Sequence, residues 1–548
     1  NPAKPEACTV EMIEHEIQSF VDLALVAQQA NYDGVEVMGS EGYFINQFTA
    51  LRTNQRDDDW GGAYENRIKL GVEIVRRIRE AVGEKFIIIF RLSMMDLVEG
   101  GSSFDEVVQF GQAIEKAGAS IINTGIGWHE ARIPTIQTKV PRAAFTWVTA
   151  KYKEHFTIPV VTSNRINTPE VAEQVLQNGD ADMISMARPF LADAEFVNKA
   201  AEGRSDEINT CIGCNQACLD HVFSGKMSSC LVNPRACHET EINIIPTKSI
   251  KKIAVVGAGP AGLSAATALA QAGHEVTLFD GESQVGGQFN IAKQVPGKEE
   301  FDETIRYYSR QLTLTGVTVK LNTRVTANEL NNSDFDDVVI ATGINPRTPA
   351  IEGIEHDKVL NYIDVLKHKK AVGKKVAVIG AGGIGFDVSE YLVHAGQGTS
   401  QDIAAYMKEW GVDMTLKARA GIEGMQKEIT PPARDVYLLQ RKASKVGAGL
   451  GKTTGWIHRT GLKHKNVKML AGCEYHKIDD DGLHLTIAGE PQVLAVDNII
   501  VCAGQDPARE LVAGLNKPYH LIGGADVAAE LDAKRAIKQG LELAIQLS

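Results

Sequence analysis

Four cysteines near the middle of the chain have a spacing that suits a metal centre. Cys211, Cys214, Cys218 and Cys230 are separated by two, three and eleven residues, and they are half of the eight cysteines present. Four thiolates at such a spacing can bind one centre as soft ligands. The spacing alone fits a structural zinc site or an iron–sulfur cluster. Because a cluster passes single electrons, the second alternative predicts a redox site on each side of the quartet.

Two glycine-rich motifs that follow the quartet predict sites for dinucleotides. The first follows a strand expected at 253–256, and Asp280 ends the next strand, at 275–279. The second follows a strand expected at 375–379. Glycines here let the backbone approach a pyrophosphate, whose charge the helix N-terminus stabilises. The motif glycines are Gly257, Gly259 and Gly262 in the first, and Gly380, Gly382 and Gly385 in the second.

An internal repeat indicates that the two motifs belong to paired domains. Residues 337–346 read Asp-Val-Val-Ile-Ala-Thr-Gly-x-x-Pro, and residues 498–507 read Asn-Ile-Ile-Val-Cys-Ala-Gly-x-x-Pro. A mostly polar insertion, residues 396–432, interrupts the second domain between its first helix and its second strand. We assign no function to this insertion from the sequence.

The second domain has cations where a bound nucleotide would place its ribose. Enzymes that use NAD end the second strand of such a unit with Asp or Glu. This chain instead has Gln440, Arg441 and Lys442 at that point. Two cations suit a 2′-phosphate, so the pattern favours NADPH, with a solvated basic pair as the alternative.

The N-terminal region alternates helices with short apolar strands, which predicts a parallel sheet. Helices are expected at 11–30 and 67–82. Polar residues gather just after the strand ends, and in a (β/α)8 barrel those ends form the active-site face. The expected strands are 34–38, 86–93, 120–124, 159–162 and 182–186.

The number of strands is too small for a closed barrel. Eight strands and about 250 residues are typical of this fold, whereas residues 1–205 provide five strands. We therefore expect that the first three βα units are missing from this sequence. A five-stranded remnant would leave two unpaired edges and an incomplete pocket.

Composition and charge exclude several classes of protein. A chain of 548 residues with 44% hydrophobic and 23% charged residues is typical of an enzyme with about three domains. The net charge of −12 argues against a nucleic-acid partner. There is no apolar run long enough for a membrane span and no signal-peptide pattern. Clustered rather than paired cysteines favour a reducing compartment, so we expect a cytoplasmic protein.

The C-terminal half resembles the flavoprotein disulfide-reductase fold, in which two dinucleotide domains bind FAD and a nicotinamide cofactor. The runs Val-Gly-Gly-Gln at 285–288 and Leu-Ile-Gly-Gly-Ala-Asp at 521–526 match two further FAD contacts of that family. The resemblance implies that Asp526 meets the ribityl chain. Besides the first-motif glycines and Asp280, the implied FAD residues are Ala261, Gly287, Gln288, Ala341, Gly343, Gly524 and Asp526.

The N-terminal half resembles the FMN barrel of the old yellow enzyme superfamily. The matching runs are Tyr-Asp-Gly-Val-Glu-Val from residue 32, Gly-Tyr-Phe-Ile-Asn-Gln-Phe from residue 42, and Trp-Gly-Gly from residue 60. The resemblance implies that Arg91 reaches the flavin pyrimidine edge. It also implies a flavin-phosphate site formed by Asn164, Arg165, Ala187 and Arg188. One departure is that Met38 to Glu41 lacks the histidines with which many members grip a carbonyl.

Barrel, quartet and paired dinucleotide domains together resemble the bacterial NADPH-dependent 2,4-dienoyl-CoA reductases, with trimethylamine dehydrogenase and enoate reductases as relatives. The run 125–132 and the Cys-x-x-Cys-Asn-Gln-Ala-Cys run from residue 211 are the basis of this choice. The resemblance implies that Tyr43 and His129 donate the proton in a conjugate reduction. It implies substrate contacts from Arg52, Glu130, Ala131 and Arg132.

The predicted protein is an α/β oxidoreductase with a partial (β/α)8 barrel, an iron–sulfur linker and two Rossmann-like domains. Electrons would pass from NADPH through FAD, a 4Fe–4S cluster and FMN to an acyl-CoA thioester. The rivals are an amine dehydrogenase or enoate reductase of this architecture and an NADPH electron-transfer module. The oligomeric state stays open, with a monomer as one option. The expected segments are 1–205 (FMN), 206–250 (cluster), 251–370 (FAD, first part), 371–495 (NADPH) and 496–548 (FAD, second part).

Overall fold

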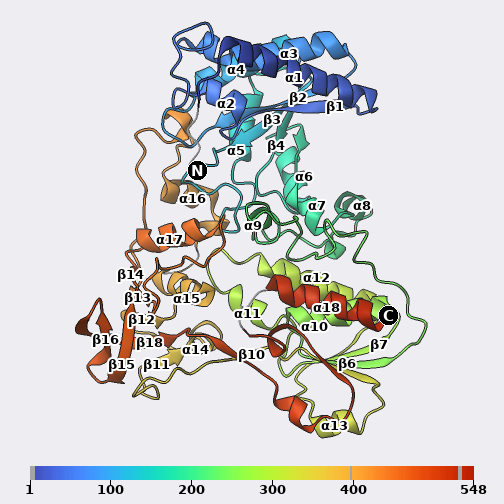
Figure 1. The fold of residues 1–548 in the computed structure, drawn as a ribbon, viewed down its shortest axis with the longest axis vertical. Coiled ribbons are helices and arrows are strands. Elements are labelled where there is room, and N and C mark those ends of the chain that lie inside the picture. The colour runs from blue at the N-terminus through green and yellow to red at the C-terminus, as the bar shows by residue number, and fades with distance from the viewer. Residues whose placement is uncertain (1–5, 395, 397, 529–532) are drawn as a thin grey trace. The chain divides into compact units, whose positions relative to one another are not determined.

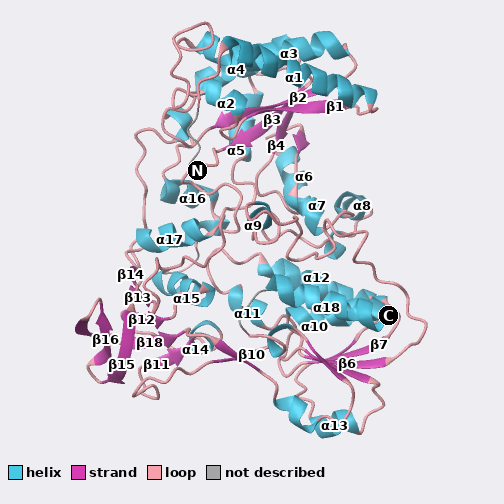
Figure 2. Ribbon diagram, viewed as in Figure 1, coloured by secondary structure: helices cyan, strands magenta, loops and turns pink. Residues whose placement is uncertain are grey.

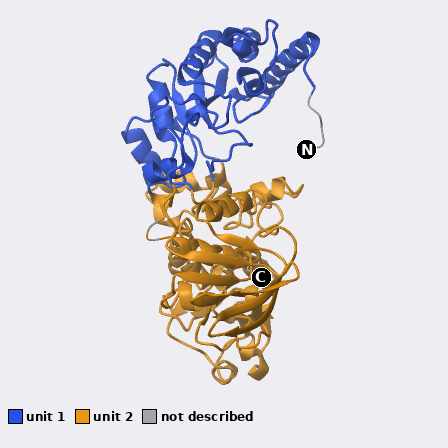
Figure 3. Ribbon diagram, turned by 90° about the vertical axis from the view of Figure 1, so that its left-hand side faces the viewer, with its two compact units in different colours: residues 1–136, 140–186, 402–428 blue, residues 137–139, 187–401, 429–548 orange. Residues whose placement is uncertain are grey.

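The chain folds into an α/β structure with two compact units (Figures 1 and 3). The structure is a computed structural model that describes residues 6–394, 396, 398–528 and 533–548. Contact within the chain groups residues 1–136, 140–186 and 402–428 as unit 1. Unit 2 comprises residues 137–139, 187–401 and 429–548.

Unit 1 is built on a parallel sheet of five strands in sequence order (Figure 2). This confirms the five predicted strands and their parallel direction. Among the described residues no further strand pairs with the outer edges of this sheet. The strands are β1 (Gly34–Gly39), β2 (Ile87–Met95), β3 (Ile121–Ile126), β4 (Val160–Thr162) and β5 (Met183–Ile184).

Helices connect these strands, and local signals explain where they begin. Ser103 and Glu106 form a capping box at the start of α4, so two backbone donors of its first turn are satisfied. Thr168 caps α6, with a proline in its first turn. The helices are α1 (Val10–Gln29), α2 (Phe44–Thr49), α3 (Tyr64–Val82), α4 (Phe104–Ala117), α5 (Thr146–Lys153) and α6 (Pro169–Gln177).

The first parallel sheet of unit 2 has the order β20-β9-β6-β7-β8. Its core includes Val255, Leu278 and Val339, all fully buried. The chain's last helix, α18 (Ala533–Leu547), packs on α10 (Pro260–Gln271), as expected of a final segment that returns to this domain. The strands are β6 (Lys252–Val256), β7 (Glu275–Phe279), β8 (Thr318–Lys320), β9 (Asp337–Ile340) and β20 (Tyr519–Leu521).

The second parallel sheet of unit 2 has the order β11-β18-β12-β13-β14. The helix α15 (Gly383–Val393) follows β12 and packs against β13. A three-stranded antiparallel sheet lies later in the chain, as β15 (Cys473–Asp479), β16 (Gly482–Ile487) and β17 (Glu490–Leu494). The parallel strands are β11 (Val359–Asn361), β12 (Lys375–Ile379), β13 (Asp435–Leu439), β14 (Lys468–Leu470) and β18 (Asn498–Val501).

The internal repeat has a structural counterpart, and it corrects two predicted boundaries. The repeat strands β9 and β18 take equivalent places, next to β6 and β12. The short strands that follow them, β10 (Ile344–Pro346) and β19 (Gln505–Pro507), pair with each other. Because β11 and β18 both belong to the second sheet, the predicted boundaries at 370 and 495 do not coincide with the sheets. The remaining segment boundaries stay predictions.

Part of the polar insertion packs in unit 1, although it interrupts the nucleotide domain in sequence. We call residues 402–428 the strap. Its helix α16 (Ile403–Trp410) buries Tyr406 and Met407 almost completely. The Tyr406 hydroxyl donates to the Pro134 carbonyl at 2.6 Å. The segment expected for the nucleotide domain, residues 371–495, is therefore divided between the two units at this stretch.

The helices of the described residues include none that is both long enough and apolar enough to cross a membrane.

Candidate functional site

The two residues expected to deliver a proton lie in contact in unit 1. The His129 Nε2 atom is 2.8 Å from the Tyr43 hydroxyl, and the two rings meet edge to face, with centroids 5.1 Å apart. Tyr43 precedes α2 after the end of β1, and His129 follows β3. Both side chains are exposed, with Tyr43 48% accessible. A substrate can therefore reach the hydroxyl while the imidazole holds it.

A polar cluster lies on three neighbouring strands of the same sheet, β1, β2 and β3. Arg91 Nη2 contacts Glu36 Oε2 at 3.0 Å, and Asn123 Nδ2 donates to Glu36 Oε1 at 2.6 Å. The Arg91 Nε and Asn123 Oδ1 atoms are buried without a hydrogen-bond partner. Buried polar atoms are normally satisfied, so this donor and this acceptor leave room for a ligand. A flavin pyrimidine edge, which has both kinds of atom, fits them.

Glu41 adds a second carboxylate beside this cluster. Its Oε1 atom is 3.7 Å from Arg91 Nη1, and its carbonyl accepts from the His129 amide at 3.4 Å. Burial raises the pKa of the Glu41 carboxyl, and the nearby Arg91 and His129 charges oppose that rise. Glu41 stands in the run that departs from the usual histidine pattern of the superfamily. Sequence reasoning noted that departure but gave Glu41 no role.

The residues expected to contact substrate differ in their exposure to solvent. Glu130 and Arg132 are exposed next to His129, whereas Ala131 is buried and its amide donates to the Trp128 carbonyl at 3.0 Å. Arg52 has an exposed side chain, and its amide donates to the Gly100 carbonyl at 2.9 Å. Their contacts with substrate stay predictions.

The expected phosphate residues fall in different units. Asn164 and Arg165 form a tight turn after β4, with φ of 72° and 59°. The Arg165 Nε atom donates to the Val140 carbonyl at 2.9 Å. Ala187 and Arg188 belong to unit 2, where Arg188 begins α7 (Arg188–Ala192). Its Nη1 atom donates to Asn215 Oδ1 at 2.6 Å. A joint phosphate site for all four residues stays a prediction.

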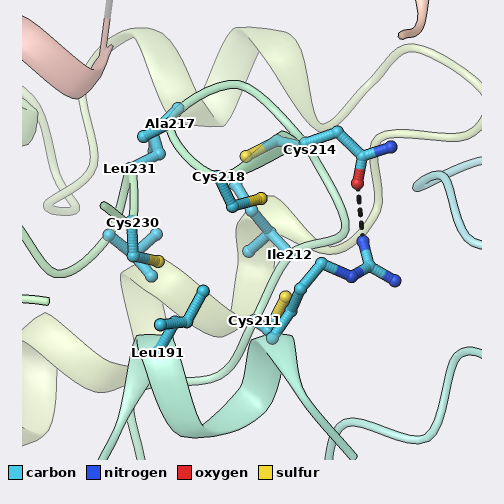
Figure 4. Close-up of a pocket in the computed structure, with 11 residues that line it drawn as sticks. Leu191, Cys211, Ile212, Cys214, Ala217, Cys218, Cys230 and Leu231 are labelled. Carbon is cyan, nitrogen blue, oxygen red and sulfur yellow. Dashed lines mark hydrogen bonds between the residues drawn. The ribbon is translucent and has the colours of Figure 1, made fainter. Parts of the chain in front are cut away.

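The cysteine quartet surrounds one small cavity in unit 2 (Figure 4). None of the four cysteines forms a disulfide with another described residue, and most of the other lining side chains are apolar. Three of the four, Cys211, Cys214 and Cys230, pack in an apolar cluster with Phe289 of α11 (Gln288–Ala292) and Ile537 of α18. The Arg188–Asn215 hydrogen bond, drawn as a dashed line, lies at its border. The remaining lining residues include Leu191, Ile212, Ala217, Leu231 and Val232.

The chemistry of these thiols suits a metal cluster. Burial raises the pKa of Cys230 to about 12 and holds that of Cys214 well above its usual range. A bound metal would stabilise the thiolates that burial disfavours.

The first glycine motif has the backbone of a dinucleotide site. Gly257 has φ of 108°, and a Cβ at Gly262 would overlap the Gly257 carbonyl oxygen. The helix α10 starts directly after Gly259, so its N-terminus faces the loop. Asp280 Oδ2 accepts from the Ala258 amide at 2.6 Å.

The other expected FAD residues gather around this motif. A Cβ at Gly287 would come within 2.8 Å of the Gly259 Cα, and one at Gly524 within 3.0 Å of the Gly343 carbonyl carbon. Ala341 is buried beside the motif, and Gln288 begins α11. Asp526 Oδ2 accepts from Gln539 Nε2 at 2.8 Å. The structure thus brings together residues from four separate parts of the sequence.

The second glycine motif repeats this geometry around Gly380, Gly382 and Gly385. Gly380 has φ of 108°, and Gly382 caps α15. Arg441 and Lys442 directly follow Gln440 at the end of β13, and both side chains are exposed. A phosphate can therefore reach these cations from solvent.

Sequence reasoning missed Asn123 and Asp96. Asn123 is a polar residue in the apolar strand β3, and that pattern break could have revealed it. Asp96 follows β2 and is 1% exposed. No local pattern distinguishes it, because two of its side-chain partners, Asn46 and Trp128, are distant in the sequence.

Two family models match the chain. Residues 2–207 match the NADH:flavin oxidoreductase / NADH oxidase family, and residues 251–532 match the pyridine nucleotide-disulphide oxidoreductases. A metal reductase of Desulforamulus reducens is 36% identical over 515 residues, which are 93% of this chain and 76% of that protein. An NADH oxidase of Thermoanaerobacter brockii is 37% identical over 421 residues, which are 75% of this chain and 64% of that protein.

A solved structure matches over the whole chain. It is a complex of 2-naphthoyl-CoA reductase with 2-naphthoyl-CoA, with a TM-score of 0.88 and 30% identity, covering 100% of this chain and 78% of that one. These matches confirm the α/β architecture and the predicted cofactor set of FMN, FAD, a nicotinamide nucleotide and a 4Fe–4S cluster as that of the family. The chain therefore belongs to the NADH:flavin oxidoreductase / NADH oxidase family, with its flavin domain joined to a pyridine nucleotide-disulphide oxidoreductase module.

Proposed function

We propose that this protein is an NADPH-dependent reductase of conjugated acyl-CoA thioesters, with 2,4-dienoyl-CoA as its substrate. The observation that supports this most is the accessible Tyr43 hydroxyl, held 2.8 Å from His129 Nε2. Conjugate reduction adds hydride at one carbon and a proton at another, so it needs a positioned acid. The similarity to a reductase solved with a CoA thioester supports the substrate class.

The residues of unit 1 have separate tasks in this proposal. Tyr43 donates a proton from its hydroxyl to the substrate carbon, and His129 returns a proton to that oxygen. Arg91 and Asn123 hydrogen-bond the pyrimidine edge of FMN through the two atoms that lack partners. When bound, FMN supplies the hydride, and FAD and the cluster supply the electrons drawn from NADPH.

Unit 2 binds the groups that receive electrons from the nucleotide. Cys211, Cys214, Cys218 and Cys230 hold the 4Fe–4S cluster in the apolar surroundings of Phe289 and Ile537. The first glycine motif and Asp280 bind FAD. The second motif binds the pyrophosphate of NADPH, while Arg441 and Lys442 bind its 2′-phosphate.

Replacing the proposed acid tests this function. Tyr43→Phe removes the hydroxyl and keeps the ring, so dienoyl-CoA reduction should fall by about 10²–10⁴-fold. NADPH oxidation by an artificial acceptor should not change, because unit 2 is intact. Tyr32→Phe is the matched control, since Tyr32 is an exposed tyrosine of the same unit at 67% accessibility. Full dienoyl-CoA reduction by Tyr43→Phe would assign the acid to another group.

The proposed cluster has its own test. Purified protein should contain about four irons and four acid-labile sulfides per chain. Cys218→Ala should lower both, whereas Cys237→Ala should not, because Cys237 is exposed and outside the cavity. Zinc without labile sulfide would contradict the cluster and leave unit 2 without its single-electron carrier.

An anaerobic titration separates the proposal from its rivals. NADPH should reduce the flavins, and dienoyl-CoA should then reoxidise them. Reduction of the flavins by a secondary or tertiary amine, with no response to NADPH, would instead support an amine dehydrogenase. Reoxidation by dyes alone would support an electron-transfer module. Reoxidation by a free enoate but not by a thioester would support an enoate reductase.

A further inference from the structure

A buried carboxylate in unit 1 accepts hydrogen bonds from four separate groups. Asp96 Oδ1 accepts from Ser93 Oγ at 2.7 Å, from Trp128 Nε1 at 2.8 Å and from Asn46 Nδ2 at 3.3 Å. Its Oδ2 atom accepts from the Ser102 amide at 2.7 Å. Asp96 and all four donor residues are less than 10% exposed. A buried network that is fully satisfied in this way holds its members in one arrangement.

One arm of this network leads to Tyr43. Asn46 lies in α2, the helix whose N-cap residue is Tyr43. While its Nδ2 atom donates to Asp96, its Oδ1 atom accepts from the Gly42 amide at 2.9 Å. The Asn46 side chain therefore connects Asp96 to the backbone of Gly42, the residue that precedes Tyr43.

The other arm leads to His129. Trp128 directly precedes His129, and its indole donates to the Asp96 carboxylate. The Trp128 amide also donates to the Asp96 carbonyl at 3.0 Å, and the Gly127 amide donates to the Met95 carbonyl at 2.8 Å. Three hydrogen bonds thus join the loop of His129 to the loop that contains Asp96.

The strap, residues 402–428, holds the Asp96 loop from outside. The Leu97 amide donates to the Ala420 carbonyl at 3.1 Å, and the Ala420 amide donates to the Ser102 carbonyl at 2.9 Å. The Arg419 Nη1 atom donates to the Gly101 carbonyl at 2.8 Å and to Glu106 Oε2 at 2.7 Å. The loop from 97 to 102 is therefore hydrogen-bonded to the strap at both of its ends.

We propose that Asp96 is a positioning residue for the Tyr43–His129 pair, and that the strap keeps its loop in place. The proposal rests on the proton-donating role of that pair under the proposed function. Asp96 is bonded to neither member of the pair, and acts through Asn46 and Trp128. A displacement of about 1 Å in a reacting group can cost about 10²-fold in rate. The inserted segment is thereby part of what sets the geometry of the reductase site.

Asp96→Asn tests the carboxylate directly. An amide keeps the size of the side chain but turns one acceptor oxygen into an NH2 group, which cannot accept from Ser102. We expect kcat for dienoyl-CoA to fall by about 10- to 100-fold with little change in KM, and NADPH oxidation by dye to stay unchanged. Hydrogen exchange of the amides at 125–132 should become faster, which reports on the loop independently of activity.

Two controls exclude a general loss of stability. Asp180→Asn removes a carboxylate of the same unit that accepts from Thr146 Oγ1 at 2.9 Å, outside this network. Arg419→Ala should reproduce the Asp96→Asn effects more weakly, since two backbone bonds to Ala420 remain. Lys417→Ala, an exposed change in the same strap, should have no effect.

The outcomes separate this proposal from the proposed function. Slow turnover and faster exchange at 125–132 in Asp96→Asn, but not in Asp180→Asn, would support the positioning role. Unchanged kcat, or exchange equal to that of Asp180→Asn, would overturn it while Tyr43→Phe still tests the acid. If Tyr43→Phe retains full activity, the acid role fails. Exchange at 125–132 in Asp96→Asn then still decides whether Asp96 holds the His129 loop.

Discussion

The two glycine motifs of unit 2 share one backbone but differ in the side chains that end the next strand. Gly257 and Gly380 both have φ of 108°. Each later motif glycine, Gly262 and Gly385, lies where a Cβ would overlap a carbonyl oxygen of its own motif. Because helix, strand and loop are equivalent, the cradle for a pyrophosphate is the same in both domains.

The residue after the second strand makes the difference. Asp280 follows β7 and accepts from the Ala258 amide of its own motif at 2.6 Å. Gln440 follows β13 and donates from Nε2 to the carbonyls of Lys442 at 2.9 Å and Ser444 at 2.8 Å. That loop therefore presents Arg441 and Lys442 to solvent. Under the proposed function, the two motifs bind different nucleotides according to the charge at this strand end.

The largest expected effects come from adding a methyl group at the last glycine of either motif. Gly262→Ala should abolish FAD binding and with it all NADPH oxidation, because the new Cβ forces helix and loop apart. Gly385→Ala should leave FAD bound but lower NADPH oxidation by on the order of 10²-fold or more. Flavin released from denatured protein and dye reduction measure the two effects. Equal FAD loss in both variants would show that the domains do not bind separately.

Removing the cations should have a smaller and more selective effect. In Arg441→Ala with Lys442→Ala, two charge-assisted contacts of about 1.5–3 kcal/mol each are lost. The preference for NADPH over NADH, measured as a ratio of kcat/KM values, should fall at least about tenfold. Lys445→Ala is the matched control, as an exposed lysine of the same loop. An equal change for both nucleotides would mean that these cations do not contact the 2′-phosphate.

The smallest expected effect comes from Asp280→Asn. The amide keeps one acceptor oxygen, so we expect a loss of about 1 kcal/mol, or about fivefold in FAD affinity. Titration of FAD into flavin-free protein measures it, with NADPH affinity as the internal reference. If Asp280→Asn lowered FAD affinity more than Gly262→Ala does, the carboxylate at the strand end would matter more for FAD binding than the glycine motif.

Local patterns predicted much of the fold. The strands β1 to β4, β6, β7, β12 and β13 lie within a few residues of their expected positions, because each is a short apolar run bounded by polar residues. The strand β5 is shorter than expected, at Met183–Ile184. The glycine motifs were recognisable because a close backbone approach admits no other residue there.

Long-range pairing was beyond such patterns. The predicted domain boundaries do not coincide with the sheets, because β18 pairs with β12 although the two strands are more than a hundred residues apart in the sequence. The insertion that contains the strap is mostly polar, and nothing in its sequence indicates which unit it packs in. Asp96 is one aspartate among many, and two of its four hydrogen-bond donors, Asn46 and Trp128, lie far from it in the sequence.

The sequence by itself determined the parallel strands, the two glycine motifs that suit a pyrophosphate, and the cysteine spacing. Each depends on neighbours within one element or one turn. Tertiary structure alone decided that Tyr43 and His129 lie in contact, that Arg91 and Asn123 leave a donor and an acceptor free, and that the strap holds the loop of Asp96. The physical reason is that hydrogen bonds and packing between distant segments depend on strand register and burial, which exist only once the chain has folded.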